Sequence, residues 1–374
     1  MTFSTLALIA VIGIAGPVLA ARRQWHVPVV LGELLAGIVF GATGFGLLDA
    51  SQPTFEFLAD VGFALTMFVA GTHVPVRDPA VRSALGKGAL RAIVVGALAS
   101  ILGVALAQAF DTGHAALYAV LMASSSAALV LPIVDSLGLR GTSVLDMTAQ
   151  VAIADTACIV ALPVVIDSAN AGRAAIGAVV VSACAIALFF GLRQLENSGL
   201  RRRVHDLSED RKFAIELRVS LAVLFALAAL ATSTHVSVML AGFSFGLAVA
   251  AVGEPRRVAK QLFALNDGFL GPLFFVWLGA RIDLRELGDH PAFIALGFAL
   301  GAGAVLVHLA ARALGQPMRL GALAASQLGV PIAAVTIGTG LQILEPGEPS
   351  ALILGALVTI AVAAVGGAVA ARRG

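Results

Sequence analysis

Apolar stretches of about twenty residues recur along almost the whole chain, and Pro, Gly or charged residues separate them. A helix of about twenty apolar residues is long enough to cross the hydrocarbon layer of a membrane. The sequence therefore predicts an all-α polytopic membrane protein with about thirteen transmembrane helices. We expect these helices at residues 4–21, 28–47, 54–73, 88–110, 114–137, 142–166, 172–194, 212–232, 235–252, 264–283, 290–312, 318–342 and 349–371.

The composition also favours a membrane protein over a soluble one. Of the 374 residues, 59% are hydrophobic and 12% are charged, whereas about 25% of the residues of soluble proteins are charged. The formal net charge of +2 gives no reason to expect a nucleic-acid partner. We expect Phe3–Ala21 to be a retained helix rather than a signal peptide, because no basic residue precedes it and Arg22 and Arg23 follow it.

Basic residues alternate between the two sides of the predicted membrane. Of the 24 Lys and Arg residues, twenty lie in or beside loops that follow odd-numbered helices or at the C-terminus, and three follow even-numbered helices. In membrane proteins the cytoplasmic loops carry the excess of Lys and Arg. We therefore expect a multi-pass protein of the inner membrane, with its N-terminus outside and its C-terminus in the cytoplasm.

The predicted helices divide into two halves. Residues 1–194 contain the first six helices and a connecting seventh, and residues 212–374 contain the last six. Residues 195–211 lie within the most charged part of the chain and are expected to form a cytoplasmic linker. Because the two halves start on opposite sides of the membrane, they are expected to form the inverted repeats on which many transporters are built.

One ionisable residue lies in the middle of a predicted transmembrane helix. Asp155 belongs to the otherwise largely apolar stretch Gln150–Pro163, with Gln150 about one turn before it and Thr156 beside it. An aspartate at the centre of a bilayer costs roughly 2.5 kcal/mol or more, and such residues usually mark ion or proton pathways. Asp155 is therefore the main candidate for binding an ion and carrying a proton, and Gln150 and Thr156 are candidates to assist it.

Helix-breaking residues occur in the fifth helix of each half. The residues concerned are Ser124, Ser125 and Ser126 in the first half, and Gln327, Gly329 and Pro331 in the second. Taken singly, such serines usually join helices, and such a proline can simply kink one. Interrupted helices can also hold a cation with their freed carbonyls and helix ends. Together with Asp155, the two interruptions predict an ion pathway at two crossed, broken helices.

Other chemical signals in the sequence are weak. The seven histidines are scattered without metal-ligand spacing, and the two cysteines, Cys158 and Cys184, lie in apolar stretches with no disulfide or zinc pattern. Gly37–Gly46 is rich in glycine, but it ends an apolar helix and no strand precedes it, so close helix packing explains it better than phosphate binding. We expect neither an enzyme nor a bound cofactor.

Several stretches resemble the monovalent cation–proton antiporter superfamily, especially its Kef-type and bacterial sodium–proton exchanger branch. They are Val27–Gly41, Leu58–Gly71, Ala149–Pro163, Gly271–Leu284 and Ala325–Val335, of which "GPLFFVWLGARIDL" at Gly271–Leu284 is the most specific. The resemblance covers essentially the whole chain and puts Asp155 on the aspartate of the family's ion-site helix. It implies thirteen helices in a panel and a core domain, a homodimer formed through the panel, and alternating access by movement of the core.

The chain departs from this family at positions that bear on the ion site. Ala154 precedes Asp155, where relatives carry Asp, Asn or Gln, and Val330 stands where Kef-type relatives have an acid. The helix predicted at 290–312 lacks the lysine that many relatives have, so that His308 and Arg312 are its only basic residues. His308 is therefore a candidate for the basic group of this helix.

The residues and the resemblance together favour a secondary antiporter that exchanges a proton for a monovalent cation, Na⁺ or K⁺, at Asp155. Burial disfavours an unoccupied carboxylate, so a proton and a cation can compete for it. One carboxylate carries one proton or one cation, which predicts electroneutral exchange. Two alternatives stay open: an organic-anion transporter of the same inverted-repeat plan, with His308 or Arg312 as its basic group, and a non-transporting membrane sensor or channel.

The predicted orientation can be tested by cysteine labelling in a variant without Cys158 and Cys184. A membrane-impermeant maleimide added to intact cells should label a cysteine at position 2 and should not label one at position 202. The reverse pattern would contradict the orientation and show that a helix has been miscounted.

Overall fold

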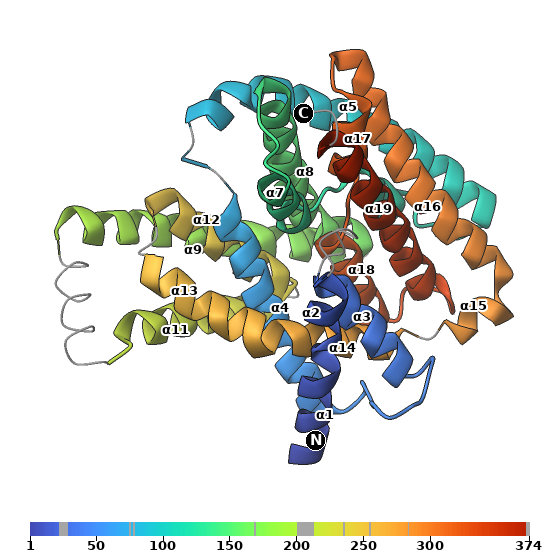
Figure 1. Cartoon of the computed structure of the whole chain (residues 1–374), viewed down its shortest axis with the longest axis horizontal. Coiled ribbons are helices and arrows are strands. Elements are labelled where there is room, and N and C mark those ends of the chain that lie inside the picture. Colours follow the sequence, from blue (N-terminus) through green and yellow to red (C-terminus); the bar gives the residue numbers. More distant parts are fainter. Residues whose placement is uncertain are drawn as a thin grey trace.

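A computed structural model describes residues 1–21, 29–74, 76–77, 79–167, 170–199, 213–234, 236–253, 256–282 and 284–371. The regular secondary structure of these residues is entirely helical (Figure 1). Among these described residues, ten helical stretches are long and apolar enough to cross a membrane, so the predicted all-α membrane fold is confirmed. Arg201–Arg203 and most of the predicted linker at 195–211 lie outside the described residues.

The helices of the first half overlap the predicted ranges, although α5 begins nine residues earlier than predicted and α3 ends seven residues earlier. They are α1 (Phe3–Gly13), α2 (Ala15–Ala20), α3 (Val29–Phe40), α4 (Pro53–His73), α5 (Pro79–Phe110), α6 (Ala115–Ala123), α7 (Ala127–Ser136), α8 (Thr142–Ile166) and α9 (Ala171–Asn197). The predicted helix at 4–21 is interrupted at Ile14. Pro17 accounts for this interruption, because it has no N–H to donate to the carbonyl of Gly13, four residues earlier.

The second half contains more interruptions than the first. Its elements are α11 (Ile215–Ser233), α12 (Val238–Val252), α13 (Arg256–Leu265), the π-helical turn η3 (Asn266–Leu270), α14 (Gly271–Arg281), α15 (Arg285–Asp289), α16 (Pro291–Ala310), the 3₁₀ turn η4 (Ala311–Leu314), α17 (Met318–Ala324), α18 (Gly329–Gly340) and α19 (Glu348–Ala371). All thirteen predicted ranges contain helix. However, α3 and α12 have only 12 and 15 residues, so thirteen spanning helices in two inverted repeats stay a prediction.

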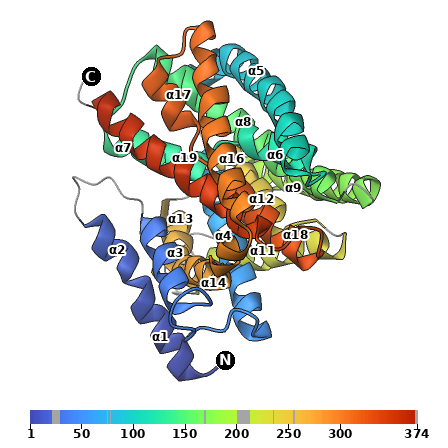
Figure 2. The ribbon, with the colours of Figure 1, turned by 90° about the vertical axis from the view of Figure 1, so that its right-hand side faces the viewer.

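The helices pack as two bundles joined by α9. We call α1–α4 with α11–α14 the panel bundle, and α5–α8 with α16–α19 the core bundle, because most helix contacts fall within these two sets. Figure 2 shows α1–α3 and α14 on one side of the molecule and α5, α16, α17 and α19 on the other. Helix α9 contacts both α8 and α12, and the bundles also meet where α4 contacts α7.

Glycines permit the closest helix contacts of the panel bundle. At Gly71, Gly242 and Gly246, helices α4 and α12 approach so closely that a Cβ atom would overlap the backbone of the facing helix. Gly37 and Gly279 play the same role between α3 and α14. Small residues commonly allow transmembrane helices to approach in this way, where dispersion and packing replace the hydrophobic effect.

Replacing Gly246 with Ala should separate α4 from α12, because the new Cβ atom would overlap the carbonyl oxygen of Phe68. We expect Gly246→Ala to destabilise the protein by about 1–3 kcal/mol, measured as a lower temperature of thermal unfolding in detergent. Gly96→Ala is the matched control, because a Cβ atom there meets open space and alanine favours helix by about 0.5–1 kcal/mol. Equal unfolding temperatures for the two variants would contradict the packing argument.

Candidate ion-binding site

The fifth predicted helix breaks at its three serines. Helix α6 ends at Ala123 and α7 begins at Ala127, and Ser124 has extended backbone dihedrals. The side chains of Ser124, Ser125 and Ser126 are all buried. The break therefore lies inside the protein at the residues that the sequence indicated.

The twelfth predicted helix breaks slightly earlier than expected. Helix α17 ends at Ala324 and α18 begins at Gly329, so residues 325–328 form the break. The expectation that unwound backbone extends to Pro331 is wrong, because Gly329 and Pro331 belong to the first turn of α18. Proline is tolerated in a first turn, where its missing N–H would have no partner within the helix.

The two breaks are hydrogen-bonded to each other. The backbone N–H of Ser126 donates to the carbonyl of Ser326 over 2.8 Å, and the Ser125 hydroxyl donates to the carbonyl of Ala324 over 2.7 Å. The side-chain amide of Gln327 donates to the carbonyl of Leu121 over 2.6 Å. Backbone groups that lose their partners at one helix break are thus hydrogen-bonded by groups of the other break. Irregular backbone inside a membrane requires such partners, because no water is available there.

Asp155 belongs to α8, and its carboxyl group lies next to the first residue of α7, beside this crossing. Its carboxyl group is buried, and the Oδ2 atom accepts a hydrogen bond from the backbone N–H of Ala127 over 2.8 Å. The N-terminal end of a helix carries a partial positive charge that favours an anion. Among the described residues, no Lys, Arg or His forms an ion pair with Asp155. The dipole of α7 and the backbone N–H group of Ala127 therefore stabilise the Asp155 carboxylate without a basic side chain beside it.

His308 contacts the crossing and not Asp155 itself. It is fully buried on α16, its Nδ1 atom lies 2.8 Å from the carbonyl of Ala304, and its Nε2 atom lies 3.2 Å from the hydroxyl of Ser125. The nearby carbonyl fixes Nδ1 as the protonated nitrogen. In the neutral ring Nε2 is then an acceptor, and the single Ser125 proton has two acceptors, Nε2 and the Ala324 carbonyl.

The structure does not bring the other two predicted helpers on α8 into contact with the Asp155 carboxylate. The hydroxyl of Thr156 donates to the carbonyl of Ala152, one turn earlier on α8. Gln150 is fully buried, and its amide has no hydrogen-bond partner among the described residues. Asp155 lies five positions after Gln150, which places the two side chains about 140° apart around the helix, so Gln150 does not share the face of Asp155.

A cavity of about 960 Å³ lies along the side of α8 that faces away from the Asp155 carboxylate, between this helix and the panel bundle. Its lining comes from α8 and from Val74, Val76, Leu85 and Leu247, and Thr156 is the only polar residue among the lining residues. The lining thus runs along α8 from Ala152 to Val165 and includes Thr156, the neighbour of Asp155.

Comparison with known proteins identifies the family. Residues 6–371 match the family described as "Sodium/hydrogen exchanger, transmembrane". The chain belongs to this family. Its fold also resembles the solved structure of the sodium proton antiporter MjNhaP1 from Methanocaldococcus jannaschii, with a TM-score of 0.67 and 15% sequence identity over 97% of this chain and 95% of that one.

Curated relatives include proteins named for two different cations. KefC of Enterobacter sp. (strain 638), a glutathione-regulated potassium-efflux system protein, is 29% identical over 357 residues, which are 89% of this chain and 55% of KefC. GerN of Bacillus cereus, a Na⁺/H⁺–K⁺ antiporter, is 24% identical over 328 residues, which are 84% of this chain and 82% of GerN. This chain thus spans about half the length of KefC.

A second buried carboxylate, which sequence reasoning missed, lies at the far end of α6. Glu348, the first residue of α19, is fully buried, and its Oε1 atom lies 2.8 Å from Nδ1 of His114 and accepts a hydrogen bond from Tyr118 over 2.7 Å. Its Oε2 atom accepts a hydrogen bond from the backbone N–H of Glu345. The signal in the sequence was an acid next to an apolar helix, with no indication of its distant partners.

His114, in the loop before α6, should make stability depend on pH. The hydrogen bond to Glu348, with the charges of Glu348 and Glu345, raises the pKa of His114 above 6.5, and burial opposes the shift. The stabilisation is therefore complete below pH 6.5 and is lost as the pH rises through the raised pKa.

The unfolding temperature of the wild type should accordingly fall across this interval, and His114→Gln should remove that fall and about 1.5–3 kcal/mol of stability at low pH. His290→Gln, at an exposed histidine, is the control and should keep the wild-type profile. A pH profile of His114→Gln that matches the wild type would contradict the assignment.

Proposed function

We propose that this chain exchanges protons for a monovalent cation, Na⁺ or K⁺, at Asp155. The observation that carries the proposal is a buried carboxylate at the N-terminal end of α7, beside two crossed helix breaks, with no basic side chain of the described residues paired to it. The names of KefC and GerN support a monovalent cation as the substrate class.

The residues around Asp155 suit alternate occupation by a proton and a cation. The N–H of Ala127 and the start of α7 stabilise the ionised carboxylate to which a cation binds. The hydroxyls of Ser124 and Ser125 donate their protons to the carbonyls of Leu121 and Ala324, which leaves their oxygen lone pairs free to face a cation. Protonation of Asp155 removes the charge that attracts the cation, so either ligand displaces the other.

The same geometry gives little support to organic-anion transport. That function needs a basic group that faces a polar cavity near the middle of the membrane. His308 is engaged with Ser125 and Ala304, and Arg312 is exposed beyond the end of α16, with its Nη1 atom 3.5 Å from the sulfur of Met318. The cavity beside α8 is almost wholly apolar.

Membrane orientation and assembly belong to the same proposal. We place the protein in the inner membrane with the N-terminus outside, on the alternation of basic residues. Residues 1–194 and 212–374 are proposed to form inverted repeats, and the panel bundle to join two copies in a homodimer.

Asp155→Asn should abolish exchange and leave the protein folded, because an amide has a similar volume but cannot alternate between a proton and a cation. The measurement is the proton flux of everted vesicles on addition of Na⁺, K⁺ or Li⁺, with Asp289→Asn, at an exposed residue of α15, as the matched control. Substantial cation-dependent flux in Asp155→Asn vesicles would overturn the assignment of Asp155.

Exchange should also be electroneutral, because Ala154 removes the neighbouring acid of relatives and Asp155 carries one ligand at a time. An uncompensated charge would couple each cycle to about 2.3 kcal/mol per 100 mV of membrane potential. In proteoliposomes with the voltage set by an ionophore, the rate and endpoint of exchange should stay constant when the voltage changes. A strong dependence on voltage would show that a second group, for which His308 is the candidate, carries another proton.

A further inference from the structure

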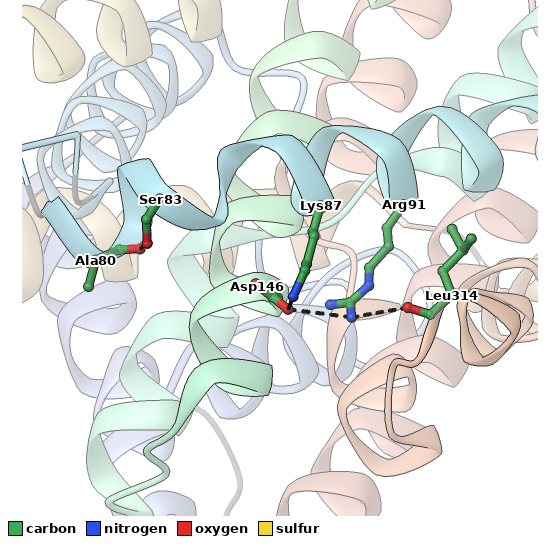
Figure 3. Close-up of polar contacts among 6 residues, drawn as sticks. All are labelled: Ala80, Ser83, Lys87, Arg91, Asp146 and Leu314. Carbon is green, nitrogen blue, oxygen red and sulfur yellow. Dashed lines mark hydrogen bonds and ion pairs between the residues drawn. The ribbon is translucent and has the colours of Figure 1, made fainter.

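A buried arginine lies at the end of the core bundle where α8 begins. Figure 3 shows Lys87 and Arg91 on α5 pointing toward Asp146 on α8, with Leu314 on the far side of Arg91. The Nη2 atom of Arg91 lies 3.6 Å from Oδ2 of Asp146 and donates to the carbonyl of Leu314 over 3.4 Å. Lys87 lies 3.8 Å from the same carboxylate oxygen, with a side chain that is 75% exposed, whereas the side chain of Arg91 is only 4% exposed.

The remaining polar atoms of this region have no partner among the described residues. They are Nε and Nη1 of Arg91 and both side-chain amide atoms of Gln150 and of Gln316. Arg91, Gln150 and Gln316 are 3%, 0% and 2% exposed, so bulk water does not reach them. Buried polar groups of native proteins are nearly always hydrogen-bonded, and an unpaired charged group is especially costly.

The fold brings the segments that carry these three side chains close to one another. Gln150 follows Asp146 by one turn of α8, and its backbone nitrogen lies against Gly88, one turn before Arg91 on α5. Gln316 follows Leu314, whose carbonyl accepts from Arg91, by two residues. Three elements distant in sequence thus bring the backbone segments that carry one guanidinium and two amides, all buried, to the same end of the core bundle.

The balance of donors and charges indicates the ligand. The unpartnered atoms offer seven N–H groups but only two oxygen acceptors. Two cations, Lys87 and Arg91, share the single carboxylate of Asp146 at ion-pair distances near the 4 Å limit. We propose that Arg91, Gln150 and Gln316 form a buried binding site for a small inorganic anion of the size of chloride.

This anion site is separate from the exchange site at Asp155. Asp146 precedes Asp155 by nine residues, which is about 13.5 Å along α8 and half a turn away around it. A bound anion would neutralise the excess positive charge and satisfy N–H groups of α5, α8 and the loop after η4 together. Ordered water, which donates as well as accepts, suits seven donors and two acceptors less well.

The test measures binding and not transport, so that its outcome is independent of the exchange reaction. Radioactive chloride is titrated by equilibrium dialysis onto the full chain in detergent, with gluconate maintaining ionic strength and a constant cation. We expect saturable binding of about one chloride per chain, weakened at least tenfold by Arg91→Gln and by Gln316→Leu. Arg140→Gln, at an exposed arginine that precedes α8, is the matched control and should bind as the wild type does.

Gln316→Leu keeps the test decisive if Arg91→Gln does not fold, because leucine removes the amide and leaves the ion pair with Asp146. The unfolding temperature of the wild type should also rise with chloride and bromide, and that of Gln316→Leu should not. Absence of saturable chloride binding to the wild type would overturn the proposal and leave the site to ordered water. Binding that both variants retain at wild-type strength would equally overturn it.

Discussion

Backbone groups freed inside a membrane must find partners within the protein, and this constraint organises the core bundle. The breaks at Ser124–Ser126 and residues 325–328 meet it by bonding to each other, through Ser126 and Ser326 above all. One broken helix alone would leave several buried groups unpaired. The crossing therefore requires both breaks at the same depth, and it fixes the position of the α7 N-terminus.

The carboxylate of Asp155 depends on that position. It accepts a hydrogen bond from the backbone N–H of Ala127 and lies at the positive end of the α7 dipole. It forms no ion pair with a basic residue in the described part of the chain. A fixed cation beside an aspartate would compete with both a proton and a transported cation. A helix end stabilises the carboxylate less strongly than a fixed cation would, and it leaves the negative charge available to a proton or a transported cation. His308 acts on the same arrangement indirectly, since it contacts Ser125 two residues before Ala127.

Different interactions hold the helices of each bundle together. In the panel bundle, Gly71, Gly242 and Gly246 bring helix backbones into contact, so that dispersion and packing dominate. In the core bundle, polar contacts also join helices that are distant in sequence, at Glu348 near one end and at Asp146 near the other. Buried polar contacts are directional and costly to leave unpaired, which suits a bundle that must hold a carboxylate in a defined place.

The sequence by itself determined the helical membrane fold and the approximate helix ranges, and it singled out Asp155 as the candidate ion-binding residue. These follow from local properties: apolar length sets what can cross a membrane, and an isolated acid among apolar residues is conspicuous. The sequence also indicated both helix breaks, although Pro331 proved compatible with the first turn of α18. Only the tertiary structure decided that the backbone of Gln150 lies against Gly88 of α5, that His308 bonds to Ser125, and that Arg91 donates to the carbonyl of Leu314, two residues before Gln316. Those outcomes depend on which helix faces meet, and neither apolar periodicity nor the spacing of polar residues along the chain encodes that.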